Sequence, residues 1–313
     1  MRKIHVLEAA SENGAGKRGA SLGPAAVILE AAEQCSEIFR GLPWTPVPDL
    51  NHRYDCRTPN RHAKNIENLS ESLEWLCDAV QKVLDAGEFP LIISGDHSNA
   101  IGAFSGVRNH YHNERIGIIW VDAHYDLHSP FTTPSGNVHG MALNALIADD
   151  NLDCQRNEPS VETIGYWEKL KRLGHHQITP KLLPSDLAFV GVRDAEDEEC
   201  HMVNKYGIFD MEPDEVDEYG IDKVIDMALD QLKDCDRIYV SFDVDSQDTS
   251  ISMGTGTPVP EGLDYPQAVR IFERLFHHPK VCAFEITEIN PMLDKDNSMA
   301  KIVMKLLSTV LPG

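Results

Sequence analysis

The chain has 313 residues, 42% of them hydrophobic, which is enough to bury a substantial core in one large α/β domain or two smaller ones. Its formal net charge of −22 argues against nucleic-acid binding, because phosphates need a basic face, and equally against an anionic membrane surface. No segment approaches the ~20 apolar residues of a membrane span, and the N-terminus lacks the apolar core of a signal peptide.

In chain order, short apolar runs alternate with segments of helical period. They predict a strand at 3–7, a helix that starts at Gly23-Pro24, a helix at 69–84, a strand at 89–94, a helix at 98–110, and strands at 116–121 and 187–192. A helix at 221–232, a strand at 237–242, a helix at 265–276, a strand at 281–286 and a helix at 298–310 follow. Residues 149–185 are polar, and we interpret them as a candidate insertion.

Strand–helix alternation throughout the chain predicts a three-layer α/β/α fold with a mainly parallel sheet. The run 116–121 is apolar without interruption, as is typical of a parallel strand that helices cover on both faces. Because no low-complexity linker interrupts the pattern, we expect residues 1–313 to form a single domain.

The number and spacing of the cysteines bear on the cellular compartment of the protein. They are widely scattered, odd in number and without a CxxC pair: Cys35, Cys56, Cys77, Cys154, Cys200, Cys235 and Cys282. This pattern favours reduced thiols over a disulfide framework or a zinc cluster, so we expect a cytoplasmic protein.

Acidic and histidine side chains follow three of the predicted strands. In an open α/β sheet, ligands bind outside the carboxyl ends of the strands, so these side chains should meet there. Four carboxylates would offset the +4 charge of two divalent ions, and ligation rich in oxygen with no thiolate favours Mn²⁺ over structural Zn²⁺. The candidate metal ligands are His97, Asp122, His124, Asp126, Asp243 and Asp245.

The alternate positions of the candidate ligands after the strand at 116–121 predict how their side chains point. In an extended segment, Asp122, His124 and Asp126 would all point to one side, because strand side chains alternate with period two. The alternative for a lone Asp-x-Asp at a strand end is a turn or a helix cap. Three clustered polar groups after a buried strand are costly unless something satisfies them, which favours the metal interpretation.

The chain resembles the ureohydrolase superfamily, and within it the arginases, over nearly its whole length. The longest matching segment runs from Asp122 to Gly140. The others include Leu22-Gly23-Pro24, Ser94-Gly95-Asp96-His97-Ser98, Gly191-Val192-Arg193-Asp194, Ser241-Phe242-Asp243-Val244-Asp245, Gly254-Thr255-Gly256-Thr257-Pro258 and Glu288-Ile289-Asn290-Pro291. At Ser94 the family usually has a glycine.

The resemblance implies two Mn²⁺ ions per chain and a role for each ligand. His97, Asp122, Asp126 and Asp243 would hold one ion. The other would be held by His124, Asp122, Asp243 and Asp245, so that Asp122 and Asp243 bridge the two. A hydroxide between the ions would attack the guanidinium carbon, since two Lewis acids lower the pKa of bound water.

Three residues match positions with catalytic roles in the family. Asp126 would protonate the leaving nitrogen, His139 would shuttle protons, and Glu288 would pair with the guanidinium of the substrate. A packed loop histidine and a structural ion pair with an arginine are the alternatives for His139 and Glu288. The family resemblance also implies a homo-oligomer, commonly a trimer or a hexamer.

The substrate-binding positions depart from the arginase pattern. Thr133, Ser135 and Asn137 lie in the segment that matches carboxylate-binding positions. His128 stands where arginases commonly have an asparagine, and Glu196, with Glu199 three residues on, stands where an aspartate is expected near the α-amino group.

Several substrates and one other class of protein therefore remain open. A small guanidino compound is expected, with L-arginine first because the Thr133 segment suits an amino acid. Agmatine, a guanidino acid and formiminoglutamate are the alternatives, although the net charge disfavours a dianion. A non-catalytic member that keeps the fold for metal binding is the alternative to an enzyme.

Overall fold

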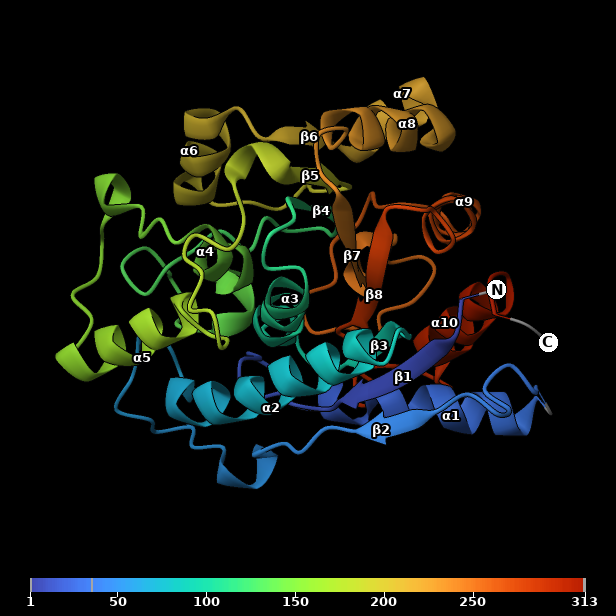
Figure 1. Cartoon of the computed structure of the whole chain (residues 1–313), viewed down its shortest axis with the longest axis horizontal. Coiled ribbons are helices and arrows are strands. Elements are labelled where there is room, and N and C mark those ends of the chain that lie inside the picture. The colour runs from blue at the N-terminus through green and yellow to red at the C-terminus, as the bar shows by residue number, and fades with distance from the viewer. Residues whose placement is uncertain (1, 35, 312–313) are drawn as a thin grey trace.

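The computed structural model describes residues 2–34 and 36–311, and its centre is one eight-stranded sheet (Figure 1). The strand order is β2-β1-β3-β8-β7-β4-β5-β6, and all neighbouring strands are parallel. The strands are β1 (Ile4–Ala9), β2 (Trp44–Pro46), β3 (Phe89–Ser94), β4 (Ile116–Val121), β5 (Leu187–Val190), β6 (Phe209–Met211), β7 (Arg237–Asp243) and β8 (Val281–Thr287).

Helices cover both faces of this sheet (Figure 1). One face is covered by α2 (Ile66–Asp85), α3 (Asn99–His110), α4 (Ala142–Ile147), α5 (Val161–Lys171) and α6 (Asp197–Tyr206). The other is covered by α1 (Gly23–Glu33), α7 (Pro213–Tyr219), α8 (Ile221–Gln231), α9 (Tyr265–Leu275) and α10 (Ser298–Ser308). Within the described ranges, no helix has the length and apolar character needed to cross a membrane. The three-layer α/β/α prediction is confirmed.

Strand β4 shows why the central runs are apolar at every position. Ile118 and Trp120 pack into the core beneath α2 and α3, whereas Ile119 and Val121 pack into the core on the opposite face. All four side chains are buried, because successive strand residues point to opposite faces and both faces are covered.

The structure contains elements that apolar runs did not predict. Strands β2 and β6 have three residues each and lie at the two edges of the sheet, where most of their side chains stay partly or fully exposed. The strand expected at 187–192 ends at Val190, since Gly191 adopts φ +97°. The helices α4, α5, α6 and α7 were also not predicted.

The segment 149–185, interpreted from the sequence as a candidate insertion, contributes buried side chains to the core, among them Trp167, Leu170 and Leu182. The side chain of Trp167, on α5, is fully buried, and its Nε1 donates to Asp150 Oδ1 at 2.7 Å. We expect Trp167→Ala to lower the free energy of unfolding by ~3–5 kcal/mol, as large-to-small changes of buried aromatics do. Urea unfolding would measure this. Val161→Ala on the same helix is the control, because Val161 is exposed and should change stability by less than ~0.5 kcal/mol.

The described cysteines are free thiols, and Cys35 lies outside the described residues. Cys77, Cys235 and Cys282 are buried. Burial raises the pKa of each of these thiols to about 12, so they stay protonated at neutral pH.

Candidate metal centre

A cavity of about 240 Å³ opens at the carboxyl ends of the central strands. His97 follows β3, Asp122 follows β4, and Asp243 is the last residue of β7. Each predicted site residue except Glu288 lines this cavity, so residues from distant parts of the sequence meet at one place. The position agrees with the general rule that parallel sheets bind ligands at this edge.

The first potential metal-binding group surrounds the imidazole of His97. Its Nδ1 lies 3.0 Å from Asp122 Oδ2, 3.1 Å from Asp243 Oδ2 and 3.2 Å from Asp126 Oδ2. All four side chains are buried. Oxygens of three carboxylates therefore surround one imidazole nitrogen, and those of Asp122 and Asp243 lie close enough to His97 to hold one metal ion with it.

The second group surrounds His124. Its Nδ1 lies 3.2 Å from Asp245 Oδ2 and 3.4 Å from Asp122 Oδ1. Asp122 thus belongs to both groups, with one oxygen directed at each histidine. Asp243 belongs only to the group that contains His97, and its other oxygen accepts a hydrogen bond from Asp245 N at 2.8 Å.

Unsatisfied atoms show that these residues fit divalent ions. Among the described residues, neither His97 Nδ1 nor Asp122 Oδ2 has a hydrogen-bond partner, although both are buried. Burial and the charge of neighbouring carboxylates raise the pKa of Asp126, Asp243 and Asp245. Bound cations would satisfy the lone pairs and offset this repulsion. The buried groups indicate a binuclear metal site.

The local backbone differs from the extended segment that the sequence suggested. Strand β4 ends at Val121, and residues 122–124 bend instead of continuing the strand. Asp126 adopts φ +52°, a left-handed conformation that is uncommon for residues other than glycine and is concentrated at functional sites. The period-two argument was therefore wrong. A bent loop gives Asp126 to the His97 group and His124 to the Asp245 group.

His139 and Glu288 lie together beside the first group. His139 Nδ1 is 3.1 Å from Glu288 Oε1, and the same oxygen accepts a hydrogen bond from His97 N at 3.0 Å. Burial alone would lower the pKa of His139, but Glu288 and the nearby carboxylates raise it to about 9. Glu288 is 2% exposed and, within the described chain, pairs with this histidine and with no arginine.

The hydroxyls of Thr133 and Ser135 sit in a tight turn on the cavity wall. Thr133 Oγ1 accepts hydrogen bonds from the backbone N–H of Gly136 at 2.9 Å and of Ser135 at 3.3 Å. Ser135 Oγ accepts from Asn137 N at 3.1 Å. Because both oxygens act as acceptors here, their protons remain available to donate to a ligand.

An ion pair occupies another part of the cavity wall. His128 Nε2 lies 3.1 Å from Glu196 Oε2, and this contact lowers the pKa of Glu196 to about 2. The charges of Glu196 and Glu199 outweigh burial and raise the pKa of His128. Glu199 is buried and accepts hydrogen bonds from Leu127 N and Glu196 N, so it also holds the loop and the start of α6 in place.

Two polar cavity residues whose side chains approach candidate ligands were not among the predicted site residues. Thr257 Oγ1 donates to Asp245 Oδ2 at 2.9 Å, which orients that carboxylate. Asp194 Oδ2 lies 3.7 Å from His124 Nε2 and is mostly exposed. Both residues lie inside segments that match the family, Gly254-Thr255-Gly256-Thr257-Pro258 and Gly191-Val192-Arg193-Asp194. Their position in these segments was the signal by which the sequence could have identified them.

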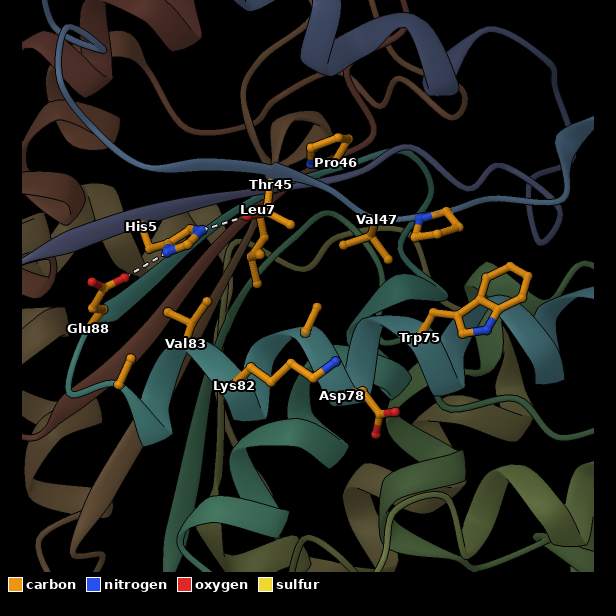
Figure 2. A pocket seen from close by; sticks show the side chains of 13 residues that line it. His5, Leu7, Thr45, Pro46, Val47, Trp75, Asp78, Lys82, Val83 and Glu88 are labelled. Atoms are coloured by element: carbon orange, nitrogen blue, oxygen red, sulfur yellow. Dashed lines mark hydrogen bonds and ion pairs between the residues drawn. The ribbon is translucent and has the colours of Figure 1, made fainter.

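A larger cavity, of about 390 Å³, lies between edge strand β2 and α2, away from the metal centre (Figure 2). Its polar end is occupied by His5, whose Nδ1 lies 2.7 Å from Glu88 Oε2 and whose Nε2 lies 2.8 Å from Thr45 Oγ1. None of the described lining residues has a buried side-chain atom without a hydrogen-bond partner. Size alone therefore does not make it the functional site.

The fold and the paired His/Asp groups are those of a binuclear metallohydrolase. The model of the Arginase family matches residues 2–312. An arginase from Bacillus caldovelox is 31% identical, covering 99% of this chain and 98% of the relative. Human Arginase-1 is 31% identical over 94% of this chain and 87% of its own. The crystal structure of the B. caldovelox arginase superposes with a TM-score of 0.85 at 30% identity, covering 100% of this chain and 99% of that one.

The chain belongs to the arginase family. It is accordingly a hydrolase that acts on C–N bonds of linear amidines, and the ureohydrolase resemblance of the sequence is confirmed.

Proposed function

We propose that this protein is a manganese-dependent arginase that hydrolyses L-arginine to L-ornithine and urea. The observation that carries the proposal is the sharing of Asp122 between two buried His/Asp groups in one cavity. The oxygen-rich donor set favours Mn²⁺ among the divalent ions. Bound there, two such ions would supply Lewis-acid activation of a water nucleophile.

The other predicted site residues would supply binding and proton transfer in this proposal. Glu288 would pair with the guanidinium, and Asp126 would give a proton to the leaving nitrogen. Thr133 and Ser135 would donate their free hydroxyl protons to the α-carboxylate. Asn137, also on the wall, would help to bind the same group.

The ion pair between His128 and Glu196 supports an amino-acid substrate. An α-amino acid carries a carboxylate and an ammonium at one end. The imidazole of His128, when protonated, suits the first, and the carboxylate of Glu196, with Glu199 behind it, suits the second when the substrate replaces their mutual contact. Agmatine lacks the carboxylate and would leave His128 without a partner on the substrate.

The decisive experiment is urea release from a panel of guanidino compounds by Mn²⁺-loaded protein. The panel contains L-arginine, agmatine and guanidino acids, and formiminoglutamate is assayed separately by formamide release. Preference for L-arginine supports the proposal. Preference for another member of the panel keeps the family and changes the substrate, and turnover of none would place the substrate outside this panel.

His139→Ala tests the proton-transfer assignment. We expect kcat to fall by ~10²–10⁴-fold, the usual contribution of general acid–base catalysis, with both ions still bound because His139 belongs to neither group. The charge of bound cations would bring the pKa of His139 down from about 9 toward the neutral range in which shuttling is efficient.

Kinetics at saturating substrate, with metal analysis of the same preparation, would measure this effect. His52→Ala is the control, since His52 lies in a short 3₁₀ helix (Asn51–Arg53) outside the cavity. An unchanged kcat in the His139 variant would end the assignment, and loss of metal would make His139 a structural residue instead.

A further inference from the structure

A buried polar cluster lies in the sheet directly behind the metal centre. It consists of Ser94 at the end of β3, Tyr239 and Ser241 on β7, and Glu285 on β8, and all four residues are 0% exposed. Glu285 is paired with Ser241 in the β7–β8 register, and Ser241 with Trp120 in the β4–β7 register. Side chains at paired positions share a face, so Trp120, Ser241 and Glu285 form one row; Ser94 and Tyr239, each two positions along its strand from that row, lie on the same face.

Hydroxyl groups alone hold the Glu285 carboxylate. Ser94 Oγ donates to Oε1 at 2.6 Å, while Tyr239 Oη and Ser241 Oγ donate to Oε2 at 2.6 and 3.0 Å. Within the part of the chain that the structure describes, no basic side chain lies within ion-pair distance of Glu285. Burial and the charge of Glu285 raise the pKa of Tyr239, so the phenol keeps the proton that it donates.

The hydrogen bond that Ser241 donates to Glu285 determines its role toward His97. A serine hydroxyl has one proton, and in Ser241 that proton is directed to Glu285. Ser241 Oγ also lies 2.7 Å from His97 Nε2, so at this contact it must accept. His97 therefore carries its proton on Nε2.

The opposite nitrogen of the same ring faces the carboxylates. With the proton on Nε2, a neutral imidazole presents a lone pair at Nδ1, which is the atom 3.0 to 3.2 Å from three carboxylate oxygens. Trp120 stacks on the ring at a centroid distance of 3.9 Å and an interplanar angle of 4°, which restrains its rotation. The ring is thus fixed in both plane and tautomer.

We propose that Glu285 is a positioning residue that acts through Ser241 to hold His97 as a metal ligand at Nδ1. Ser94, where the family usually has a glycine, supplies a third hydroxyl to the same carboxylate. Groups that orient a ligating histidine commonly contribute 10–100-fold to metal affinity, which is why a residue that touches no substrate can matter here. The inference rests on the binuclear site of the proposed function.

Glu285→Gln tests the inference, because it keeps the shape, removes the charge and replaces one of the two acceptor oxygens with an NH2 donor, which weakens the hold on the Ser241 proton. We expect the affinity for one of the two Mn²⁺ ions, the one beside His97, to fall by ~10–100-fold. Equilibrium dialysis would count the ions, and the electron paramagnetic resonance spectrum would change from that of a coupled pair toward that of a single ion. The melting temperature of the metal-free protein reports structural damage separately.

Two further variants separate positioning from packing. Ser241→Ala should weaken the same ion, and adding Glu285→Gln to it should weaken that ion no further, since Glu285 acts through the serine. Tyr239→Phe removes a hydroxyl from the same carboxylate oxygen without touching Ser241 or His97. It should lower the melting temperature and leave both metal affinities unchanged.

The outcomes are distinguishable from failure of the proposed function. A parent protein that binds fewer than two ions would overturn the binuclear site itself. A parent that binds two, with a Glu285→Gln variant that binds both equally well, would overturn the positioning role. Equal loss of metal in the Tyr239→Phe and Glu285→Gln variants would show that the cluster acts only by packing. Ser241→Ala carries the test if Glu285→Gln does not fold.

Discussion

Asp122→Ala should remove both metal ions and reduce kcat by at least ~100-fold, the upper end of what loss of a mere orienting partner costs. Asp122 directs Oδ2 at His97 and Oδ1 at His124, so it is the carboxylate common to both groups. His97 belongs to the first group only. His97→Ala should therefore leave one ion bound and cost less metal than Asp122→Ala.

Metal analysis of Mn²⁺-reconstituted variants would measure both occupancies, together with urea release. Asp243→Ala is predicted to resemble Asp122→Ala if Asp243 bridges the ions, and to resemble His97→Ala if it serves only the first group. Glu196→Ala is the control, since it removes a carboxylate from the same cavity but from neither group. Two ions retained in the Asp122 variant would contradict a shared ligand.

The central strands could be predicted because they are covered on both faces. Strands β3, β4, β7 and β8 are buried along nearly their whole length and therefore read as mainly apolar runs, although Ser241 interrupts β7 and Glu285 interrupts β8. The edge strand β2 gives no such signal, because its three residues include Pro46 and are partly or fully exposed. Its pairing with β1 is a property of the tertiary structure.

The convergence of the candidate metal ligands could be predicted because each lies at or after the end of a strand that the sequence itself reveals. What the sequence could not show was the backbone between them. The left-handed φ of Asp126 is set by the loop that follows β4, and nothing in the alternation of Asp122, His124 and Asp126 indicates it. The candidate ligands converge as expected, but a bent loop brings them together and not an extended segment.

Contacts between distant residues were the least predictable part of the site. His128 and Glu196 are 68 positions apart, and each was recognised only as a departure from the family pattern. Their ion pair follows from the start of α6 lying against the loop after β4, which Glu199 secures through Leu127 N. The sequence likewise does not show that Ser241 and Glu285 are neighbours, because their pairing depends on the register of β7 and β8.

L-arginine should exceed agmatine in kcat/KM by a large factor, of order ~10⁴, if Thr133 and Ser135 are built to bind an α-carboxylate. Their hydroxyl oxygens already accept backbone hydrogen bonds, and their protons would be left without a partner when agmatine binds. Steady-state kinetics on both substrates with one Mn²⁺-loaded preparation would give the ratio directly.

His128→Asn should lower KM for arginine and change KM for agmatine less. Asparagine restores the residue that arginases commonly have there, and it frees Glu196 from its 3.1 Å contact, so that this carboxylate can meet the α-ammonium. In the parent, the imidazole must be protonated to pair best with a carboxylate. Its pKa is raised by Glu196 and Glu199, so it is cationic below that pKa and neutral above it.

The parent should therefore lose affinity for arginine as pH rises through the pKa of His128, whereas the asparagine variant, which has no titrating group at this position, should not. Measuring KM for arginine and agmatine across neutral and alkaline pH separates this effect from any change in kcat. Agmatine provides the internal control, because it has no carboxylate for His128 to contact. Equal turnover of agmatine and arginine by the parent would mean that the hydroxyls of Thr133 and Ser135 serve the fold of the turn and not the substrate.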